Sequence, residues 1–121
     1  MAQLATRIRG PVSVIGDVHG QVDQLISVLD QLRSRRDFDE RWIVFIGDLV
    51  DRGPDTKGAL EIVSDLLIEH PRTTMVSGNH ELAMAGALNL IPVPDYAEWA
   101  PRWINDYLSE STFESYGVGH G

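Results

Sequence analysis

The middle of the chain reads Trp42-Ile43-Val44-Phe45-Ile46, a continuous apolar run, and then Gly47-Asp48-Leu49-Val50-Asp51-Arg52-Gly53. A short, uninterrupted apolar run rich in β-branched residues is typical of a strand buried on both faces. The glycine and the polar residues after it predict a loop where the strand ends. We therefore expect a buried strand that delivers polar side chains to the loop at its carboxyl end.

The same order of patterns precedes this strand. Pro11 to Gly16 is a short β-branched run that predicts a strand, and Gln21 to Arg33 carries apolar residues at helical spacing. The chain therefore begins with a predicted strand followed by a predicted helix.

The pattern returns after the middle strand. Residues 59–67 again show helical spacing, between a cap at Asp55 or Thr56 and an end forced by Pro71. Thr73 to Ser77 predicts a third, weaker strand. Short strands joined by helices imply parallel pairing with right-handed crossovers, so we expect an α/β fold with a β-α-β-α-β parallel core.

The pattern changes beyond Gly86. Aromatic residues recur there at near-helical spacing and predict a helix from Ala97 to Leu108, and the set consists of Tyr96, Trp99, Trp103 and Tyr107. Core packing is the favoured interpretation of these rings, over a substrate groove. Ser115 to Gly121 has no periodicity and is expected to fray.

Composition limits the possible functions. The 121 residues carry 18 Asp and Glu against 10 Lys and Arg, a net charge of -8, and no cysteine. The chain length fits one domain over residues 1–121, and any metal must bind oxygen and histidine because no thiol is present. The negative charge disfavours non-specific nucleic-acid binding, and no apolar run approaches the ~20 residues of a membrane helix. The apolar stretch Val12 to Ile15 is also too brief for a signal peptide, so we expect a cytoplasmic protein without nucleic-acid or membrane partners.

Each predicted strand ends in a glycine followed by polar residues. The three blocks are Gly16-Asp17-Val18-His19-Gly20, Gly47-Asp48-Leu49-Val50-Asp51-Arg52-Gly53 and Gly78-Asn79-His80-Glu81. One such block alone would favour ordinary turn chemistry, but three on successive strand ends favour a site. Loops at the carboxyl ends of parallel strands meet at one edge of the sheet, where ligands bind.

The side chains brought together there are Asp17, His19, Asp48, Asp51, Asn79 and His80, with Arg52 beside them. Crowded carboxylates without compensating charge are costly, so a cation is expected. Carboxylate, imidazole and amide donors suit Mn, Fe or Zn better than calcium. One carboxylate on a middle strand can bridge two ions ~3.5–4 Å apart, and Asp48 is the candidate.

These ordered blocks resemble the calcineurin-like metallophosphoesterases. The form Gly-Asp-Leu-Val-Asp-Arg-Gly with Gly-Asn-His-Glu is most similar to the serine/threonine phosphoprotein phosphatase branch, and the resemblance runs from about Val12 to Glu81. It implies the amino-terminal half of a four-layer α/β/β/α sandwich. By position, it implies Asp17 and His19 as ligands of a first metal, Asp48 as the bridge and Asn79 as a ligand of the second.

The same resemblance implies roles in substrate binding and catalysis. His80 corresponds to the family's general acid, oriented by Asp51, and Arg52 grips the phosphate together with Asn79 and His80. The implied reaction is attack on phosphorus by a metal-bound hydroxide, without a phosphoenzyme. The substrate class is a phosphoserine or phosphothreonine protein or a small phosphoester, with two divalent ions as cofactors, manganese favoured over iron or zinc.

The chain also departs from the family pattern. The family completes its metal shells with histidines from strands well beyond the third block, and the sequence stops at Gly121. Three strands also leave apolar sheet surface without cover. We therefore expect an incomplete domain, the amino-terminal part of a longer enzyme, and weak or no activity from the 121-residue chain alone.

Other polar residues have simpler interpretations. His70 before Pro71 is expected to be solvated at a helix end, and His120 to have no role in the site. Glu81 is expected to be a charge partner of a helix amino terminus rather than a metal ligand. The arginines at 33, 35 and 36 are expected to compensate a helix dipole rather than bind nucleic acid.

Two alternatives to a phosphoprotein phosphatase stay open. One is a dinucleoside polyphosphate hydrolase of the same superfamily, whose second block commonly lacks an acid at the place of Asp51. The other is a noncatalytic module that binds metal or phosphate, which the missing ligands would explain. The joint presence of the block residues speaks against that module.

Overall fold

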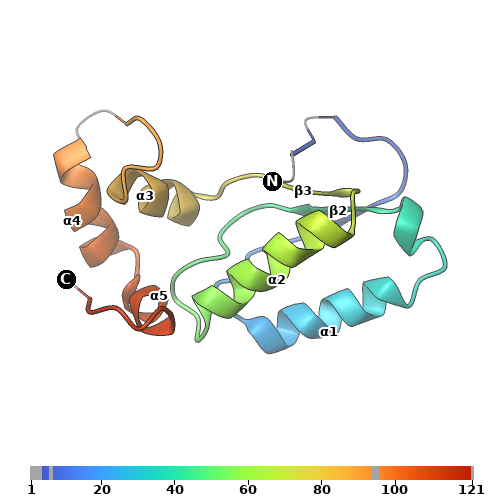
Figure 1. The fold of residues 1–121 in the computed structure, drawn as a ribbon, viewed down its shortest axis with the longest axis horizontal. Helices are drawn as coiled ribbons and strands as arrows, with labels where there is room; N and C mark the ends of the chain where they lie inside the picture. Colours follow the sequence, from blue (N-terminus) through green and yellow to red (C-terminus); the bar gives the residue numbers. More distant parts are fainter. Residues whose placement is uncertain (1–3, 6, 94–95, 121) are drawn as a thin grey trace.

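The computed structural model describes residues 4–5, 7–93 and 96–120. The elements are β1 (Val12–Ile15), α1 (Val22–Arg33), a 3-10 turn η1 (Phe38–Glu40), β2 (Trp42–Phe45), α2 (Thr56–Glu69), β3 (Thr73–Met75), α3 (Asn79–Ala87), α4 (Tyr96–Asp106) and α5 (Glu110–Ser115) (Figure 1). The predicted α/β fold and its β-α-β-α-β order are confirmed. Among the described residues, no helix is long and apolar enough to cross a bilayer.

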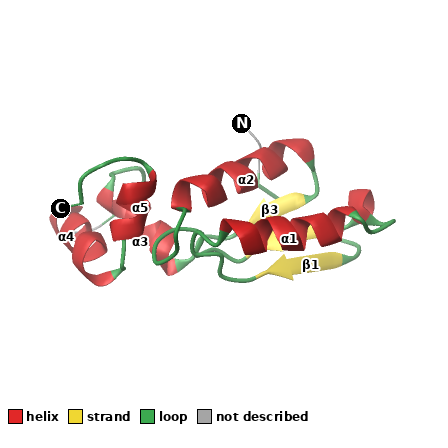
Figure 2. Cartoon of the chain, turned by 90° about the horizontal axis from the view of Figure 1, so that it is seen from below, coloured by secondary structure: helices red, strands yellow, loops and turns green. Residues whose placement is uncertain are grey.

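The three strands form one parallel sheet in the order β1-β2-β3. Val14 of β1 pairs in register with Val44 of β2, which pairs with Thr74 of β3. Helices α1 and α2 both lie over one face of this sheet (Figures 1 and 2). Strand β2 is therefore the middle strand in space as well as in sequence, a placement that the sequence alone did not provide.

The main core lies between the sheet and these two helices. Ile43 and Phe45 of β2 are fully buried against Leu29 of α1 and Val63 of α2. Each such side chain contributes about 1.5–3 kcal/mol when it is removed from water. This core fixes the strands and therefore the direction in which their carboxyl-end loops leave the sheet.

The opposite face of the sheet corrects one prediction. The middle strand was expected to be buried on both faces, but Val44 is only half-buried and Ile46, just after β2, is exposed. On the neighbouring strand Val14 is 61% exposed. The physical reason is that both crossover helices cover the same face, so one side of the sheet lacks a packed layer in the described residues.

The prediction that His70 is solvated is wrong, because the side chain is buried. Its Nε2 lies 2.8 Å from the carbonyl oxygen of Phe38 and its Nδ1 lies 2.9 Å from Oγ1 of Thr73. The η1 turn folds over the end of α2 and encloses the ring. At the other end of α2 the predicted cap is present, since Gly58 N donates to Asp55 Oδ1 at 2.8 Å.

Helices α3, α4 and α5 form a second small core beside the carboxyl ends of the strands (Figure 1). Trp103 is buried against Ala83 and Ala87, which confirms the packing role predicted for this ring.

The prediction that the chain frays from Ser115 onward is wrong at the start of that segment. Residues 110–115 form α5, and the backbone N–H of Val118 still donates to the carbonyl oxygen of Phe113, so this segment is folded beyond Ser115.

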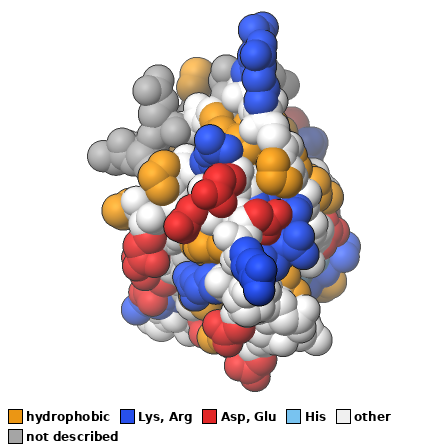
Figure 3. All heavy atoms as spheres, turned by 90° about the vertical axis from the view of Figure 1, so that its right-hand side faces the viewer, with side chains coloured by type: hydrophobic (Ala, Val, Ile, Leu, Met, Phe, Trp, Pro, Cys, Tyr) orange, Lys and Arg blue, Asp and Glu red, His pale blue; other side chains and the backbone are white. Residues whose placement is uncertain are grey.

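The opposite end of the molecule, where the strands begin, is charged and exposed. Figure 3 shows basic and acidic side chains interspersed over this end. Hydrogen bonds from Arg41 and then Arg35 hold the pKa of the Asp37 carboxyl well below its usual range. Arg33, Arg35 and Arg36 at the end of α1 are exposed, as the sequence predicted.

Candidate functional site

The loops after β1 and β2 are bound to each other through their backbones. The N–H groups of Val18 and His19 donate to the carbonyl oxygen of Asp48 at 3.1 and 2.9 Å, and Gly20 N donates to Leu49 O at 3.0 Å. Buried backbone groups need partners, and these loops provide them for each other. The prediction that the first two blocks lie side by side is confirmed.

Two glycines allow the loops to come this close. A Cβ atom at Gly47 would lie 2.1 Å from the backbone nitrogen of Gly78, which joins the second block to the third. A Cβ atom at Gly53 would lie 1.3 Å from the carbonyl oxygen of His19, which joins the second block to the first. Any side chain at these positions would separate the strand ends, so glycine is required for the loops to converge.

Four residues of the blocks have a left-handed backbone. The φ angles are 44° at His19, 55° at Asp48, 70° at Asp51 and 66° at Arg52. Such conformations cost non-glycine residues about 1–2 kcal/mol each and persist only where the surrounding structure holds them. The cluster lies at the residues that the sequence assigned to the site, which supports a functional reason for the strain.

Three side chains form a group that suits a cation. The candidate ligand atoms of Asp17, His19 and Asp48 lie within 4.8 Å of one another. Nδ1 of His19 lies 2.8 Å from the carbonyl oxygen of Val50, so this nitrogen donates and leaves Nε2 as the ligand atom. That Nε2 is 3.7 Å from Oδ2 of Asp17. Two carboxylates and an imidazole of fixed tautomer fit a divalent metal such as manganese, iron or zinc.

Asp48 also contacts the third block. Its Oδ1 accepts a hydrogen bond from the backbone N–H of His80 at 3.2 Å, at the amino terminus of α3. Asn79, the first residue of this helix, is exposed beside that contact. Asp48 therefore lies between the group formed by Asp17 and His19 and the turn that carries Asn79.

His80 and Asp51 form a buried pair. Nδ1 of His80 lies 2.9 Å from Oδ2 of Asp51, which is fully buried. An ionised carboxylate only accepts, so Nδ1 donates and Nε2 is the nitrogen that can exchange a proton with a ligand. The His80 ring lies edge-on to the ring of His19, with 4.8 Å between centroids. Asp51 also accepts hydrogen bonds from Trp103 and Thr112, and the sequence did not indicate a site role for either residue.

Glu81 has a larger structural role than the sequence indicated. Its carboxylate accepts from Gly78 N, as expected at a helix amino terminus, and also from the backbone N–H groups of Asp48, Leu49 and Val50. The bonds to Leu49 and Val50 measure 2.8 and 3.2 Å. One buried side chain therefore binds the loop after β2 to α3 and supports the strained backbone of Asp48.

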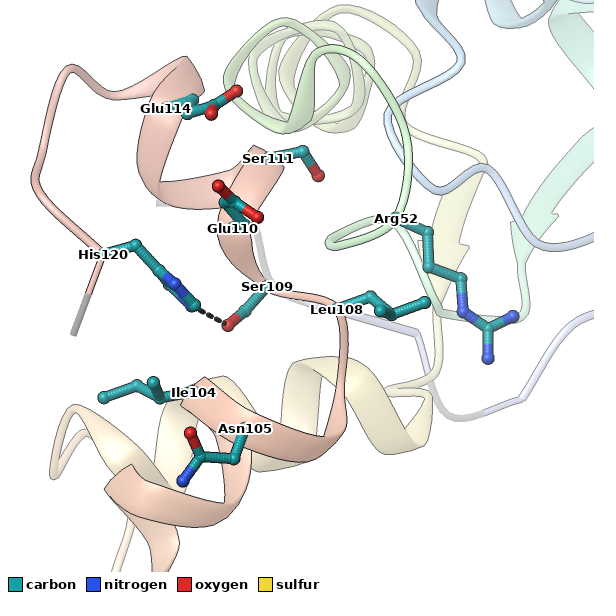
Figure 4. A pocket seen from close by; sticks show the side chains of 9 residues that line it. All are labelled: Arg52, Ile104, Asn105, Leu108, Ser109, Glu110, Ser111, Glu114 and His120. Carbon is teal, nitrogen blue, oxygen red and sulfur yellow. Dashed lines mark hydrogen bonds between the residues drawn. The ribbon is translucent and has the colours of Figure 1, made fainter.

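Arg52, the charged residue that follows Asp51 in the second block, is exposed. Its guanidinium makes no ion pair with any other described residue, and it borders an open pocket of about 530 Å³. Figure 4 shows Arg52 on one side of this pocket and Ser109 and His120 on the other. His120 Nε2 lies 3.1 Å from Ser109 Oγ, and its ring packs on Phe113. That His120 has no role in the site stays a prediction.

Comparison with known proteins identifies the family. A family model described as calcineurin-like phosphoesterase matches residues 10–120. The chain belongs to this family. The metallophosphoesterase resemblance is therefore confirmed, and the three-stranded parallel sheet is consistent with the amino-terminal half of the metallophosphoesterase fold.

Curated relatives include enzymes of two kinds. The chain is 37% identical over 75 residues to a protein phosphatase 2A catalytic subunit from Dictyostelium discoideum, which covers 61% of this chain and 23% of that protein. It is 38% identical over 73 residues to the asymmetrical bis(5'-nucleosyl)-tetraphosphatase PrpE from Halalkalibacterium halodurans, and the match covers 55% of this chain and 29% of that protein. It is 42% identical over 69 residues to a symmetrical bis(5'-nucleosyl)-tetraphosphatase from Salmonella newport, and the match covers 57% of this chain and 23% of that protein. The chain therefore spans about a quarter of the length of these relatives.

Proposed function

We propose that the whole protein containing this chain is a metal-dependent phosphatase that hydrolyses phosphomonoesters. The observation that carries this proposal is the meeting of Asp17, His19 and Asp48 beside the buried His80–Asp51 pair at one edge of the sheet. Family membership supports the reaction class. The single domain and the cytoplasmic location predicted from the sequence stay predictions.

The metal ligands follow from the donor atoms. Asp17 and His19 would hold one divalent ion, and Asn79 would contribute to a second. Asp48 lies between these two sets of ligands and would contribute to both ions. Manganese is the favoured metal. When bound, the ions would supply the positive charge that polarises the phosphoryl group and activates water for attack on phosphorus.

The remaining residues act on the substrate itself. Arg52 would bind phosphate oxygens and offset their charge, which an acidic protein needs in order to accept an anion. His80 would bind the phosphate with Asn79 and donate a proton from Nε2 to the leaving oxygen. Asp51 would keep the imidazole oriented through the 2.9 Å bond to Nδ1.

Phosphoserine and phosphothreonine are the proposed substrates, on two grounds. The chain has an acid at Asp51, which the second block of the dinucleoside polyphosphate hydrolases commonly lacks. One curated relative is the catalytic part of a protein phosphatase. The second candidate is dinucleoside tetraphosphate hydrolysis, favoured by the similarity to two tetraphosphatases.

The test is turnover of the whole protein on an aryl phosphate, a phosphopeptide and a dinucleoside tetraphosphate, each with manganese and with a chelator. We expect metal-dependent hydrolysis and a preference for the phosphopeptide. Turnover that persists in the chelator would contradict the mechanism. A strong preference for the dinucleoside tetraphosphate would favour the second candidate instead.

The general acid has its own test. His80→Ala should leave bound manganese nearly unchanged and slow alkyl phosphates more than aryl phosphates, because a good leaving group needs less protonation. His120→Ala is the control at a histidine expected to have no role. Equal slowing of alkyl and aryl substrates in His80→Ala would exclude the proton-donating role.

A further inference from the structure

We propose that Thr112 and Trp103 are positioning residues, which fix the Asp51 carboxylate in the orientation that aligns His80. Both residues belong to the segment after α3, which the three sequence blocks do not include. The inference rests on the proposed function, because alignment of His80 affects turnover only if His80 donates a proton.

The carboxylate of Asp51 has a donor on every side that the structure describes. Oδ2 accepts from Nδ1 of His80 and from Nε1 of Trp103, both at 2.9 Å. Oδ1 accepts from the hydroxyl of Thr112 at 2.7 Å. Rotation of the carboxylate would break the bonds to Trp103 and Thr112 at once, so these two donors determine where Oδ2 meets His80.

Thr112 binds the backbone of Asp51 as well as its side chain. The single hydroxyl proton of Thr112 goes to the carboxylate, so Thr56, whose Oγ1 is 2.9 Å away, must donate to Thr112. The backbone N–H of Asp51 also donates to Thr112 Oγ1 at 2.9 Å. The Thr112 hydroxyl therefore binds both the backbone N–H and the carboxylate of Asp51. These bonds stabilise the φ of 70° at Asp51, which is unfavourable for a residue other than glycine.

Burial makes this network decisive. Asp51 and Thr56 are fully buried, and Thr112, Trp103 and His80 are nearly so. Water is excluded and cannot replace a lost donor, and an incompletely bonded buried carboxylate is costly. Among the described residues, His80 is the one ionisable donor to this carboxylate. The neutral donors of α4 and α5 therefore orient the carboxylate, and His80 takes its alignment from it.

The experiment compares three variants of the whole protein. Thr112→Val removes the hydroxyl while keeping the side-chain volume, Thr112→Ser restores it, and Thr56→Val removes a neighbouring buried hydroxyl that does not contact the carboxylate. We expect Thr112→Val to lower kcat for an alkyl phosphate about tenfold, a part of the usual general-acid contribution, with little change in KM. The loss should be smaller for an aryl phosphate, smaller in Thr56→Val, and largely absent in Thr112→Ser.

A measurement without turnover or metal separates this inference from the proposed function. Nitrogen NMR of the metal-free protein reports which nitrogen of His80 carries the proton and how fast the Trp103 indole N–H exchanges with water. We expect Nδ1 to be protonated and the indole proton to be protected in the wild type and Thr112→Ser. Both features should weaken in Thr112→Val and persist in Thr56→Val.

The outcomes are distinguishable. A wild type that hydrolyses no phosphoester but shows the NMR pattern would refute the proposed function and leave the alignment of His80 supported. Equal slowing of alkyl and aryl substrates, or an unchanged His80 and indole signal in Thr112→Val, would overturn the positioning role. Equal effects of Thr56→Val and Thr112→Val would also overturn it, because they would indicate a general loss of packing.

Discussion

At the carboxyl ends of the three strands, Asp51, His80 and Glu81 are buried, and their polar atoms are bonded to other parts of the chain. At the amino ends of the same strands, Asp37 and Arg35 form an ion pair at 2.9 Å with side chains that are 36% and 50% exposed. A buried group that loses its partner stays unsatisfied, whereas an exposed group is solvated instead. The two ends should therefore respond very differently to equivalent substitutions.

The largest difference should come from glycine substitutions. Gly53→Ala should destabilise the protein by about 3 kcal/mol, because the new Cβ atom meets the backbone of His19 and overpacking moves both loops. Gly10→Ala at the amino end meets atoms only at 3.7 Å or beyond and should cost about 1 kcal/mol, for its positive φ. Urea unfolding measures both values. Equal losses would contradict the close contact at Gly53.

A smaller difference is expected for acids. Glu81→Gln should cost about 2–3 kcal/mol, because an amide NH₂ would face backbone N–H groups that now donate to a carboxylate. Asp37→Asn, its counterpart at the amino end, should change the unfolding midpoint only slightly, because Arg35 is exposed and Arg41 keeps its hydrogen bonds to Val12 O and Ser13 Oγ. If Asp37→Asn were as damaging as Glu81→Gln, burial would not explain the contrast.

The smallest effect should be the pH dependence of the amino end. The pKa of Asp37 is lowered in the folded protein by Arg41 and then Arg35, so its ion pairs stabilise the protein above the unfolded pKa of about 3.9. This contribution should be lost as the pH falls through the lower folded pKa. The gap in urea midpoint between wild type and Asp37→Asn should therefore narrow below about pH 4. If the difference in urea midpoint widened as the pH fell, the pKa of Asp37 would not be lowered in the folded protein.

Local sequence signals predicted the helices and strands better than they predicted which side chains those elements bury. The order of strands and helices follows from periodicity and from Pro71, and these signals are local. The burial of His70 was not predicted because it depends on the η1 turn, which is distant in sequence. The open face behind Val14 was missed because a continuous apolar run does not reveal which face the helices cover.

The candidate site shows the same limit. Glycine-bounded blocks predicted the convergence of Asp17, His19 and Asp48, because strand ends meet at one edge of a parallel sheet. The sequence did not predict that Glu81 would reach the loop after β2, which depends on the pairing of β2 with β3. Thr112 lies 61 residues from Asp51, and no periodicity connects the two. Contacts of this kind require the tertiary structure.

The bridging position of Asp48 is tested by the manganese content of the whole protein in wild type, Asp17→Asn and Asp48→Asn, measured together with the rate of phosphate ester hydrolysis. Asp48 lies between two blocks, while Asp17 belongs to the first alone. We predict that Asp48→Asn reduces the binding of both ions and lowers the rate more than Asp17→Asn, which weakens the binding of one ion. Equal loss of both ions in the two variants, or a wild type that binds no manganese, would contradict it.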